Sequence, residues 1–330
     1  MKNKKDFRIV FMGTPEFAVE SLKALVENDY NVVGVVTMPD KPAGRGHKLQ
    51  FSAVKEYAMS QNLPILQPEK LKDPEFLDQL KALNADLQIV VAFRMLPEVV
   101  WDMPHYGTFN LHASLLPQYR GAAPINWAII NGDKETGVTT FFLTHEIDTG
   151  KVIKQEKVQI GDDENIGSLY DRLMNLGGNV VTQTVDMILS GEVDAVDQET
   201  MFNEPSELRA APKIFKDTCK INWADKVENI HNLVRGMSPY PAAWGIIYLN
   251  GSDFQVKIYE TKKITENHNL PIGTIKTDNK TYLNVAAKDG FISILSLQLP
   301  GKKRMDITSF LNGTKLIEGS CFVINEINDN

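Results

Sequence analysis

The sequence has little cysteine and no long uninterrupted apolar run. Its two cysteines, Cys219 and Cys321, are too far apart for the close spacings of metal-binding or redox motifs. No run approaches the roughly 20 apolar residues that a membrane-spanning helix needs. The apolar run that follows the basic N-terminus, residues 9–12, is too short for a secretory signal. We therefore expect a cytoplasmic protein with no metal centre and no membrane association.

Two common nucleotide-binding signatures are also missing. The turn at 13–16, Gly-Thr-Pro-Glu, has one glycine, whereas a dinucleotide-binding fingerprint has three. No Walker lysine follows a glycine-rich loop anywhere in the chain. An NAD-dependent dehydrogenase is therefore disfavoured, and we expect no NAD.

The composition is that of an ordinary globular protein, but the charge is unevenly distributed. The 330 residues suffice for two domains, and the net charge of −7 disfavours a surface covered in nucleic-acid-binding sites. Between Arg209 and Arg304, however, 15 Lys and Arg stand against 8 Asp and Glu. A basic region attached to an acidic one fits an enzyme domain joined to a polyanion-binding domain. Unevenly charged solvated surfaces explain the distribution almost as well.

The first 190 residues alternate between strand and helix patterns. An apolar strand at 9–12, a helix that Thr14 caps with Pro15 in its first turn, and a second strand at 31–37 form a βαβ unit. The sheet therefore starts parallel. Further strands are expected near 65 and at 86–93, 107–111, 137–143 and 152–160. Further helices are expected from 52, at 74–83, at 124–130 and at 166–189, the last interrupted at Gly177-Gly178.

The remainder of the chain has a different character. Residues 192–211 are polar without sustained periodicity, which indicates a linker. A helix near 226–235 then precedes short β-rich runs at 244–249, 254–259, 282–286 and 291–297. Several short strands separated by Gly, Asn and Asp turns are typical of a small antiparallel barrel. We expect an α/β protein with a first domain at 1–191, a linker at 192–211 and a second domain at 212–330.

The segment 109–124 carries the most informative polar pattern. Phe109 and Leu111 alternate with Asn110 and His112, so the amide and the imidazole project to the same side of a strand. Asn110 can donate a hydrogen bond to a developing oxyanion, and His112 can carry a proton near neutral pH. Acyl transfer to an amine needs both abilities. On its own, an Asn-x-His pair is more often structural, with the histidine capping a loop.

A carboxylate follows the next predicted strand. Asp148 stands in a turn, His-Glu-Ile-Asp-Thr-Gly at 145–150. Because ligands of open α/β sheets bind beyond the carboxyl ends of strands, Asp148 and His112 could lie together there. The carboxylate would then orient the imidazole and favour its protonated form. The alternative is an ordinary turn aspartate that bonds its own backbone.

A basic segment rich in Pro and Gly follows the second predicted strand. Residues 39–48 contain so many helix and strand breakers that we expect no regular element there. Lys41, Arg45 and Lys48 could meet the phosphates of a nucleic acid. A flexible surface loop is the alternative.

Taken together, these motifs resemble the folate-dependent formyltransferases, and among them the methionyl-tRNA formyltransferase family, over most of the chain. The Asn/His/Asp set with Ser-Leu-Leu-Pro is common to the folate-dependent enzymes, whereas the basic loop and the second domain point to the members that act on tRNA. The motifs are Gly13-Thr-Pro15, Pro39-Asp-Lys-Pro-Ala-Gly-Arg-Gly46, Asn110-x-His112, Ser114-Leu-Leu-Pro117, Arg120-Gly-Ala-Ala-Pro124, Asp148-Thr-Gly150, Asn222-Trp223, Arg235-Gly-Met-Ser-Pro-Tyr-Pro-Ala-Ala-Trp244 and Pro300-Gly-Lys-Lys303.

The resemblance implies a Rossmann-like catalytic domain, an OB-like tRNA-binding barrel and a monomer without a metal. The implied reaction moves the formyl group of 10-formyltetrahydrofolate to the α-amine of methionine on initiator tRNA, for translation initiation. The implied catalytic residues are Asn110, His112 and Asp148. The implied folate-binding residues are Ser114, Leu115, Leu116, Pro117, Val91, Ala92, Phe93, Arg94, Met95 and Leu96. The implied tRNA-binding residues are Lys41, Arg45, Lys48, Arg235, Lys302, Lys303 and Arg304.

The chain departs from the family pattern at one place, and two alternatives stay open. The family commonly has a glycine after the aromatic residue near position 93 and one more residue before Leu-Pro, whereas here residues 92–97 read Ala-Phe-Arg-Met-Leu-Pro. The departure bears on the shape of the pterin pocket and on the role of Arg94. A formyltransferase acting on a nucleotide-linked amino sugar would share the Asn/His/Asp set. A tRNA-binding module with an inactive first domain is the alternative from another class.

Overall fold

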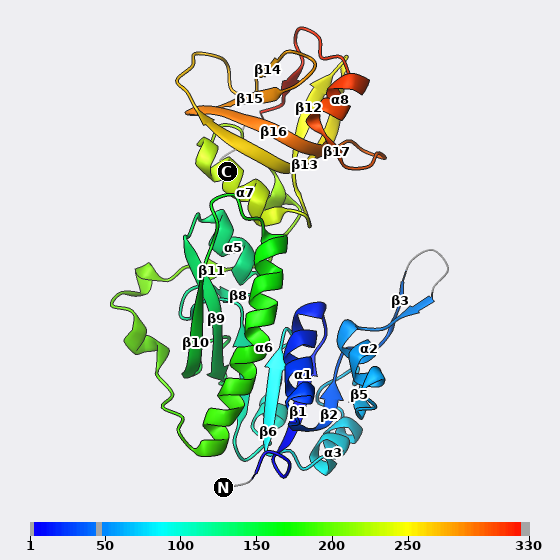
Figure 1. Ribbon diagram of the computed structural model, residues 1–330, viewed down its shortest axis with the longest axis vertical. Helices are drawn as coiled ribbons and strands as arrows, with labels where there is room; N and C mark the ends of the chain where they lie inside the picture. Colours follow the sequence, from blue (N-terminus) through cyan, green and yellow to red (C-terminus); the bar gives the residue numbers. More distant parts are fainter. Residues whose placement is uncertain (1–2, 44–47, 325–330) are drawn as a thin grey trace. The chain divides into compact units, whose positions relative to one another are not determined.

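The computed structural model describes residues 3–43 and 48–324, and contacts divide the chain into two compact units (Figure 1). The predicted linker, 192–211, lies within unit 1, and two short segments of the predicted first domain lie within unit 2. The functional domain boundaries stay a prediction. Unit 1 comprises Met1–Pro124, Thr136–Val158 and Tyr170–Ala211, and unit 2 comprises Ile125–Glu135, Gln159–Leu169 and Pro212–Asn330.

Unit 1 is built on a seven-stranded sheet with the strand order β10-β9-β7-β6-β1-β2-β5. The central pairs β7–β6, β6–β1, β1–β2 and β2–β5 are parallel, and β9 pairs antiparallel with β7. The predicted α/β class with a mostly parallel, Rossmann-like sheet is confirmed. The strands are β1 (Arg8–Gly13), β2 (Asn31–Val36), β5 (Ile65–Leu66), β6 (Leu87–Val91), β7 (Thr108–His112), β9 (Glu135–Phe142) and β10 (Val152–Gln159).

The helices predicted for the first 190 residues are present, but one cap differs and the short helix α4 was not predicted. Ser52 caps α2, where its hydroxyl accepts from the Lys55 N–H. Pro15, not Thr14, directly precedes α1, and no side chain caps that helix. The helices are α1 (Glu16–Glu27), α2 (Ala53–Ser60), α3 (Pro74–Ala82), α4 (Glu98–Trp101), α5 (Pro124–Ile130) and α6 (Ile166–Ser190).

Helix α6 runs unbroken through Gly177-Gly178, so the predicted interruption is wrong. A Cβ atom on Gly177 would lie 2.6 Å from Cδ2 of Leu111, and one on Gly178 would lie 3.0 Å from the carbonyl oxygen of Glu20. The two glycines thus allow α6 to approach β7 and α1. Figure 1 shows α6 beside α1. Tertiary packing outweighs the low helix propensity of glycine here.

The two faces of β7 are covered by different elements. The register sets Asn110 opposite Phe141 and His112 opposite Thr139, so these four side chains share one face. Leu111 points to the other face, where α6 packs. Beside Asn110 and His112, a buried apolar cluster from β1, β6, α3 and α4 fills the shared face. Its members include Val10, Met12, Phe76, Leu80, Val90 and Val100.

The basic segment 39–48 begins and ends in a two-stranded ribbon. Strand β3 (Lys41–Ala43) pairs antiparallel with β4 (Lys48–Gln50). The prediction that this segment contains no regular element is therefore wrong at its ends. Pro42 is tolerated in β3 because a two-stranded ribbon leaves one edge of each strand unpaired. Arg45 lies outside the described residues.

Unit 2 contains an antiparallel barrel with the strand order β14-β15-β16-β13-β12-β18, and β17 pairs with β16. A bridge between Thr274 and Cys321 joins its two ends, and the Phe322 N–H donates to the Gly273 carbonyl at 2.9 Å. The predicted small barrel is confirmed as nearly closed. The strands are β12 (Ala243–Leu249), β13 (Ser252–Thr265), β14 (Ile275–Thr277), β15 (Leu283–Ala287), β16 (Gly290–Gln298), β17 (Met305–Asp306) and β18 (Cys321–Phe322).

Two helices accompany the barrel. The amphipathic helix α7 (Val227–Met237) was expected, and α8 (Ile307–Gly313) was not. Asp306 caps α8 by accepting from the Ser309 N–H at 2.8 Å, which is a start signal the sequence already contained. Both helices bury apolar side chains in the barrel core. The largest buried members of that core include Trp223, Ile230, Val234, Ile247, Phe310 and Phe322.

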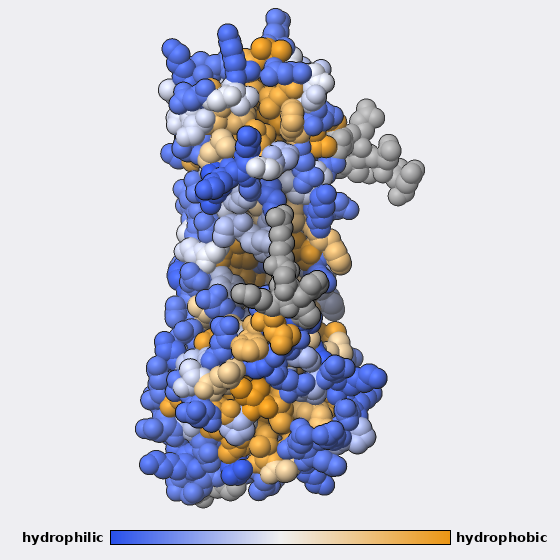
Figure 2. Space-filling model, turned by 90° about the vertical axis from the view of Figure 1, so that its right-hand side faces the viewer, coloured by the Kyte–Doolittle hydropathy of each residue, from blue (hydrophilic) through white to orange (hydrophobic). Residues whose placement is uncertain are grey.

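The surface is mixed in character. Figure 2 shows one face on which hydrophilic side chains predominate, with apolar patches between them. Large apolar side chains that stay exposed include Leu49, Met95 and Ile147. Across the described residues, none of the helices combines the length and apolarity required to cross a membrane.

Candidate active site

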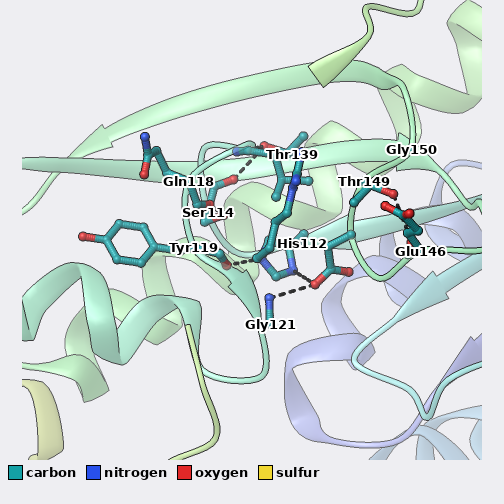
Figure 3. Close-up of polar contacts among 12 residues, drawn as sticks. His112, Ser114, Gln118, Tyr119, Gly121, Thr139, Glu146, Thr149 and Gly150 are labelled. Carbon is teal, nitrogen blue, oxygen red and sulfur yellow. Dashed lines mark hydrogen bonds and ion pairs between the residues drawn. The ribbon is translucent and has the colours of Figure 1, made fainter. Parts of the chain in front are cut away.

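His112 and Asp148 come together in unit 1, as the sequence predicted. The His112 ring is 7% exposed, and its Nδ1 lies 3.9 Å from Oδ2 of Asp148. Its Nε2 lies 2.8 Å from the carbonyl oxygen of Tyr119 (Figure 3). Because a carbonyl oxygen can only accept, Nε2 carries the hydrogen of that bond. In the neutral ring, Nδ1 therefore holds the free lone pair, facing the carboxylate.

Asp148 reaches His112 by a route that differs from the predicted one. The prediction placed both residues beyond the carboxyl ends of neighbouring strands. Strand β9 instead runs antiparallel to β7, and the Leu143 N–H donates to the Thr108 carbonyl, at the opposite end of β7 from His112. The loop after β9 folds back along the sheet to bring Asp148 to the imidazole.

Backbone groups hold the Asp148 carboxylate in place. Its Oδ2 accepts from the Gly121 N–H at 2.9 Å. Gly121 has φ +124°, and a Cβ atom there would lie 2.6 Å from the Ala211 carbonyl oxygen. Glycine is therefore required at 121 both for its conformation and for its close approach to the neighbouring strand. Asp148 itself has a positive φ of 56°.

Asn110 has unused hydrogen-bonding capacity on the same face. Its amide oxygen is buried and lacks a hydrogen-bond partner among the described residues. Two positions along the strand, the His112 ring meets Phe141 edge to face, with ring centroids 6.5 Å apart. Buried polar atoms normally find partners, so an unpartnered one beside a histidine marks a candidate ligand contact. In the described part of the chain, no three His, Cys, Asp or Glu side chains are placed to hold a metal ion.

The first group of predicted folate residues forms a tight loop after β7. Ser114 is fully buried, and its hydroxyl donates to the Gln118 carbonyl at 2.6 Å. Thr139 donates to the Ser114 carbonyl at 2.6 Å. Leu116 is buried in an apolar cluster with Phe141. Pro117 is also buried and Leu115 is half-buried, so most side chains of 114–117 shape the loop from inside.

The second group, residues 91–96, contains the departure from the family pattern. Ala92 has φ +47°, a conformation that favours glycine, directly before Phe93. The Arg94 guanidinium donates to the Glu69 carbonyl at 2.8 Å and also to the Pro68 carbonyl. Arg94 therefore holds a neighbouring loop. Within the segment Val91 and Leu96 are buried, Phe93 is half-buried, and Ala92 and Met95 are exposed.

The predicted tRNA residues are in different situations. Lys41 is exposed on β3, Lys48 lies in β4, and Lys302 and Lys303 are exposed after β16. Arg304 already makes several contacts within unit 2. Its guanidinium donates to the Ser296 hydroxyl at 2.8 Å, pairs with Glu260 and stacks 4.7 Å from the Tyr259 ring centroid.

Arg235 differs from the exposed lysines among the predicted tRNA residues, because it is 5% exposed. Its guanidinium donates to Asn232 Oδ1 at 2.9 Å and to the carbonyls of Gly161 and Glu164 at 3.3 and 3.0 Å. Burial lowers the pKa of Arg235 from its ordinary value. The side chain holds segments of unit 2 together and is not available to a polyanion in this conformation.

Sequence reasoning missed Gln198, which lies in the predicted linker. Gln198 is 2% exposed, and its Oε1 accepts from Nε and Nη2 of Arg120 at 3.0 and 2.7 Å. Its Nε2 donates to the carbonyls of Asp148 and Gly150 at 2.9 and 2.8 Å. A glutamine in a polar segment carries no local signal of such contacts, so only the folded chain reveals them.

Comparisons with solved structures support the fold. The chain superposes with a TM-score of 0.62 on WlaRD, a sugar 3N-formyltransferase crystallised with dTDP and 5-N-formyl-THF, at 22% identity, covering 90% of this chain and 99% of that one. An N-formyltransferase from Helicobacter canadensis, in complex with folinic acid and dTDP-3-aminofucose, also gives 0.62, at 20% identity over 91% of this chain and all of the other. At such identities the likeness speaks for the fold alone.

Sequence comparisons identify the family. A formyl transferase family model matches residues 7–185, and a model of the formyl transferase C-terminal domain matches residues 213–315. The methionyl-tRNA formyltransferase of Parabacteroides distasonis is 65% identical over 95% of this chain and 98% of its own length. That of Bacteroides thetaiotaomicron is 62% identical over 96% and 98%. The chain therefore belongs to the methionyl-tRNA formyltransferase family.

Proposed function

We propose that this protein transfers the formyl group of 10-formyltetrahydrofolate to the α-amino group of methionine on initiator tRNA. Family membership supports the reaction class. The observation that carries the site assignment is the buried His112, whose Nδ1 faces Asp148, with the side chain of Asn110 two positions away on the same face of β7. A proton carrier and an oxyanion donor on one face of a sheet are the groups that acyl transfer to an amine requires.

Asn110 is assigned to the oxyanion. The amine attacks only in its neutral form, and a free α-amino group titrates near ~8, so this is a modest demand at neutral pH. As the new C–N bond forms, the formyl oxygen becomes negatively charged in a tetrahedral intermediate. The Asn110 side-chain N–H would donate to that oxygen. Removing one such donor typically costs about 10²–10³ in rate.

We assign proton transfer to His112, with Nδ1 as the nitrogen that accepts and returns the proton. Nε2 is committed to the Tyr119 carbonyl, which leaves Nδ1 to accept the proton that the attacking amine loses. The same nitrogen would return a proton to the folate N10 as the bond from N10 to the formyl carbon breaks. While protonated, the ring would have an acceptor on each side, the Tyr119 carbonyl and the Asp148 carboxylate. Asp148 thus orients and supports the carrier.

The loops at 91–96 and 114–117 are assigned to the folate, and basic residues in both units to the tRNA. Lys41 in unit 1 and Lys302 and Lys303 in unit 2 are exposed, as phosphate contacts require. The predicted contact of Arg45 lies outside the described residues. Because phosphate contacts release counterions, affinity for tRNA is expected to fall as salt rises.

Formyl transfer from 10-formyltetrahydrofolate to three acceptors tests the proposal. The acceptors are methionyl initiator tRNA, free methionine and a UDP-linked amino sugar, each with the wild-type protein and with His112→Ala. Product on the tRNA alone, lost in the variant, is the expected result. Product on the sugar nucleotide would overturn the acceptor while leaving the Asn/His/Asp assignment standing. Absence of product on all three would overturn the proposed reaction.

A further inference from the structure

We propose that Gln198 is a positioning residue, which holds the Tyr119 carbonyl and the Asp148 carboxylate on either side of the His112 ring. The inference rests on the proposed roles of His112 and Asp148. It adds a residue from a segment that lies 50 positions further along the chain than Asp148.

The side-chain amide of Gln198 is buried and fully used. An amide offers two N–H donors and an oxygen with two acceptor sites. Both donors bind backbone carbonyls, those of Asp148 and Gly150, and the oxygen accepts two bonds from Arg120. A buried amide with every bond made has one orientation, so it can act as a rigid connection between the groups it binds.

Those groups belong to the two loops that flank His112. Arg120 stands between Tyr119, whose carbonyl meets Nε2 of His112, and Gly121, whose N–H meets the Asp148 carboxylate. On the other side, Gln198 binds the carbonyl of Asp148 itself. One side chain therefore joins the Arg120 guanidinium on one side of the imidazole to the Asp148 backbone on the other.

The two loops have backbone conformations that need such support. Tyr119 has φ +61°, Asp148 has φ +56° and Gly121 has φ +124°. Non-glycine residues in the left-handed region persist only where their surroundings hold them there. Gln198 bonds directly to the peptide carbonyl of one of these positions and to the side chain between the other two.

The loop after β7 offers a matched control for Gln198, which is Gln118. Gln118 Nε2 donates to the Glu207 carbonyl at 2.9 Å, and its Oε1 accepts from the Arg209 N–H at 2.9 Å. Gln118 thus connects residues 207–209 to the loop after β7, and Gln198 connects its own segment to the same loop. Among the described contacts, no hydrogen bond joins the Gln118 side chain to the Asp148 turn. Gln118→Met and Gln198→Met are the same chemical change, which removes two side-chain hydrogen bonds at 118 and four at 198.

The first measurement is steady-state kinetics of the full-length chain with methionyl initiator tRNA. We expect Gln198→Met to lower kcat by about 10- to 100-fold, the range seen when groups that orient a reactive residue are lost. The KM values for folate and tRNA should change little, since no substrate contact is removed. Gln118→Met should leave kcat close to that of the wild type, and thermal melts of both variants measure how much stability each change removes.

The second measurement is the ¹⁵N spectrum of histidine-labelled protein, which reports the tautomer of the His112 ring. In the wild type, the neutral ring should carry its hydrogen on Nε2, because that nitrogen donates to the Tyr119 carbonyl. Gln198→Met should give a mixture of tautomers, and Gln118→Met should not. A residue that only stabilised the fold would leave the tautomer unchanged. Gln198→Glu, which keeps the acceptor for Arg120 but loses both donations, serves if Gln198→Met does not fold.

The outcomes separate this inference from the function on which it rests. Wild-type kcat and an unchanged His112 tautomer in both Gln198 variants would overturn the positioning role. An equal loss of kcat in Gln118→Met would also overturn it, since the loss would then follow the stability of the segment. If His112→Ala itself kept full activity, the proposed function would fail first.

Discussion

Each unit of the molecule buries a histidine with a carboxylate within 4 Å, yet the two sites differ in kind. His112 in unit 1 is 7% exposed, and Asp148 lies 3.9 Å from its Nδ1. His231 in unit 2 is 3% exposed, and Asp163 lies 3.2 Å from its Nε2. The residue types and distances alone do not tell which histidine serves the reaction.

The surroundings make the difference. Asp148 is 13% exposed at its side chain and accepts from a backbone N–H, whereas the Asp163 side chain is 83% exposed. The other nitrogen of His231 meets the Thr261 hydroxyl on β13. Burial lowers the pKa of His231, and Asp163 opposes that change only in part. The buried and fixed carboxylate of Asp148 is why we assign the proton to His112, whereas the solvated carboxylate of Asp163 indicates a structural contact.

Replacing each of the two buried histidines with glutamine should give the largest difference in rate between the two units. His112→Gln removes the proton carrier, and we expect formyl transfer to methionyl initiator tRNA to fall by about 10³-fold, within the range for lost acid–base catalysis. His231→Gln should change kcat little, since unit 2 carries no assigned catalytic group. Rates of both variants measured under one condition check the expectation. A large kcat loss in His231→Gln would erase the distinction drawn between the two sites.

The next largest difference in kcat is expected between alanine substitutions of two buried asparagines. The amide oxygens of Asn110 in unit 1 and Asn284 in unit 2 are both buried without a partner among the described residues. Asn110→Ala should lower kcat by about 10²–10³, because an oxyanion donor is lost. Asn284→Ala should leave kcat near the wild-type value. Equal rates in the two variants would sink the oxyanion assignment.

Substitutions at two glycines test whether the loop that binds Asp148 affects the rate. Gly121 and Gly191 both have positive φ, but a Cβ atom at 191 would meet nothing within 4 Å, whereas one at 121 would meet the Ala211 carbonyl. Gly191→Ala therefore measures the backbone cost alone. Gly121→Ala should also displace the N–H that binds Asp148, and we expect kcat to fall about 10-fold. Thermal melts and rates of both variants separate the two effects, and matching rates would count against the Gly121 contact.

The smallest effect should appear in stability against pH. Burial lowers the pKa of His231 below its ordinary 6.5, so the unfolded chain binds more protons between those two values. The stability that neutral His231 contributes is present above pH 6.5 and is lost as pH falls through the lowered pKa. Urea unfolding at pH 7 and pH 5 should show a smaller difference for His231→Gln than for the wild type. An identical difference in both proteins would contradict the buried, neutral state.

Local patterns in the sequence were enough to predict most of the elements and the shared face of Asn110 and His112. Alternation at 109–112 predicted a strand with Asn110 and His112 on one face, because side chains in a strand alternate strictly. Apolar runs and caps likewise predicted β1, β2, α2 and the barrel strands of unit 2. The fold class and the family followed from signals within short stretches of chain.

Tertiary structure alone decided how distant segments meet. The antiparallel direction of β9, the unbroken α6, the burial of Arg235 and the contacts of Gln198 all depend on residues far apart in sequence. Propensity and periodicity describe a residue's neighbours along the chain, whereas these features depend on packing and on satisfying buried polar groups across it. For that reason the sequence was enough to propose Asn110, His112 and Asp148 for the chemistry, and only the folded chain revealed the contacts that hold them in place.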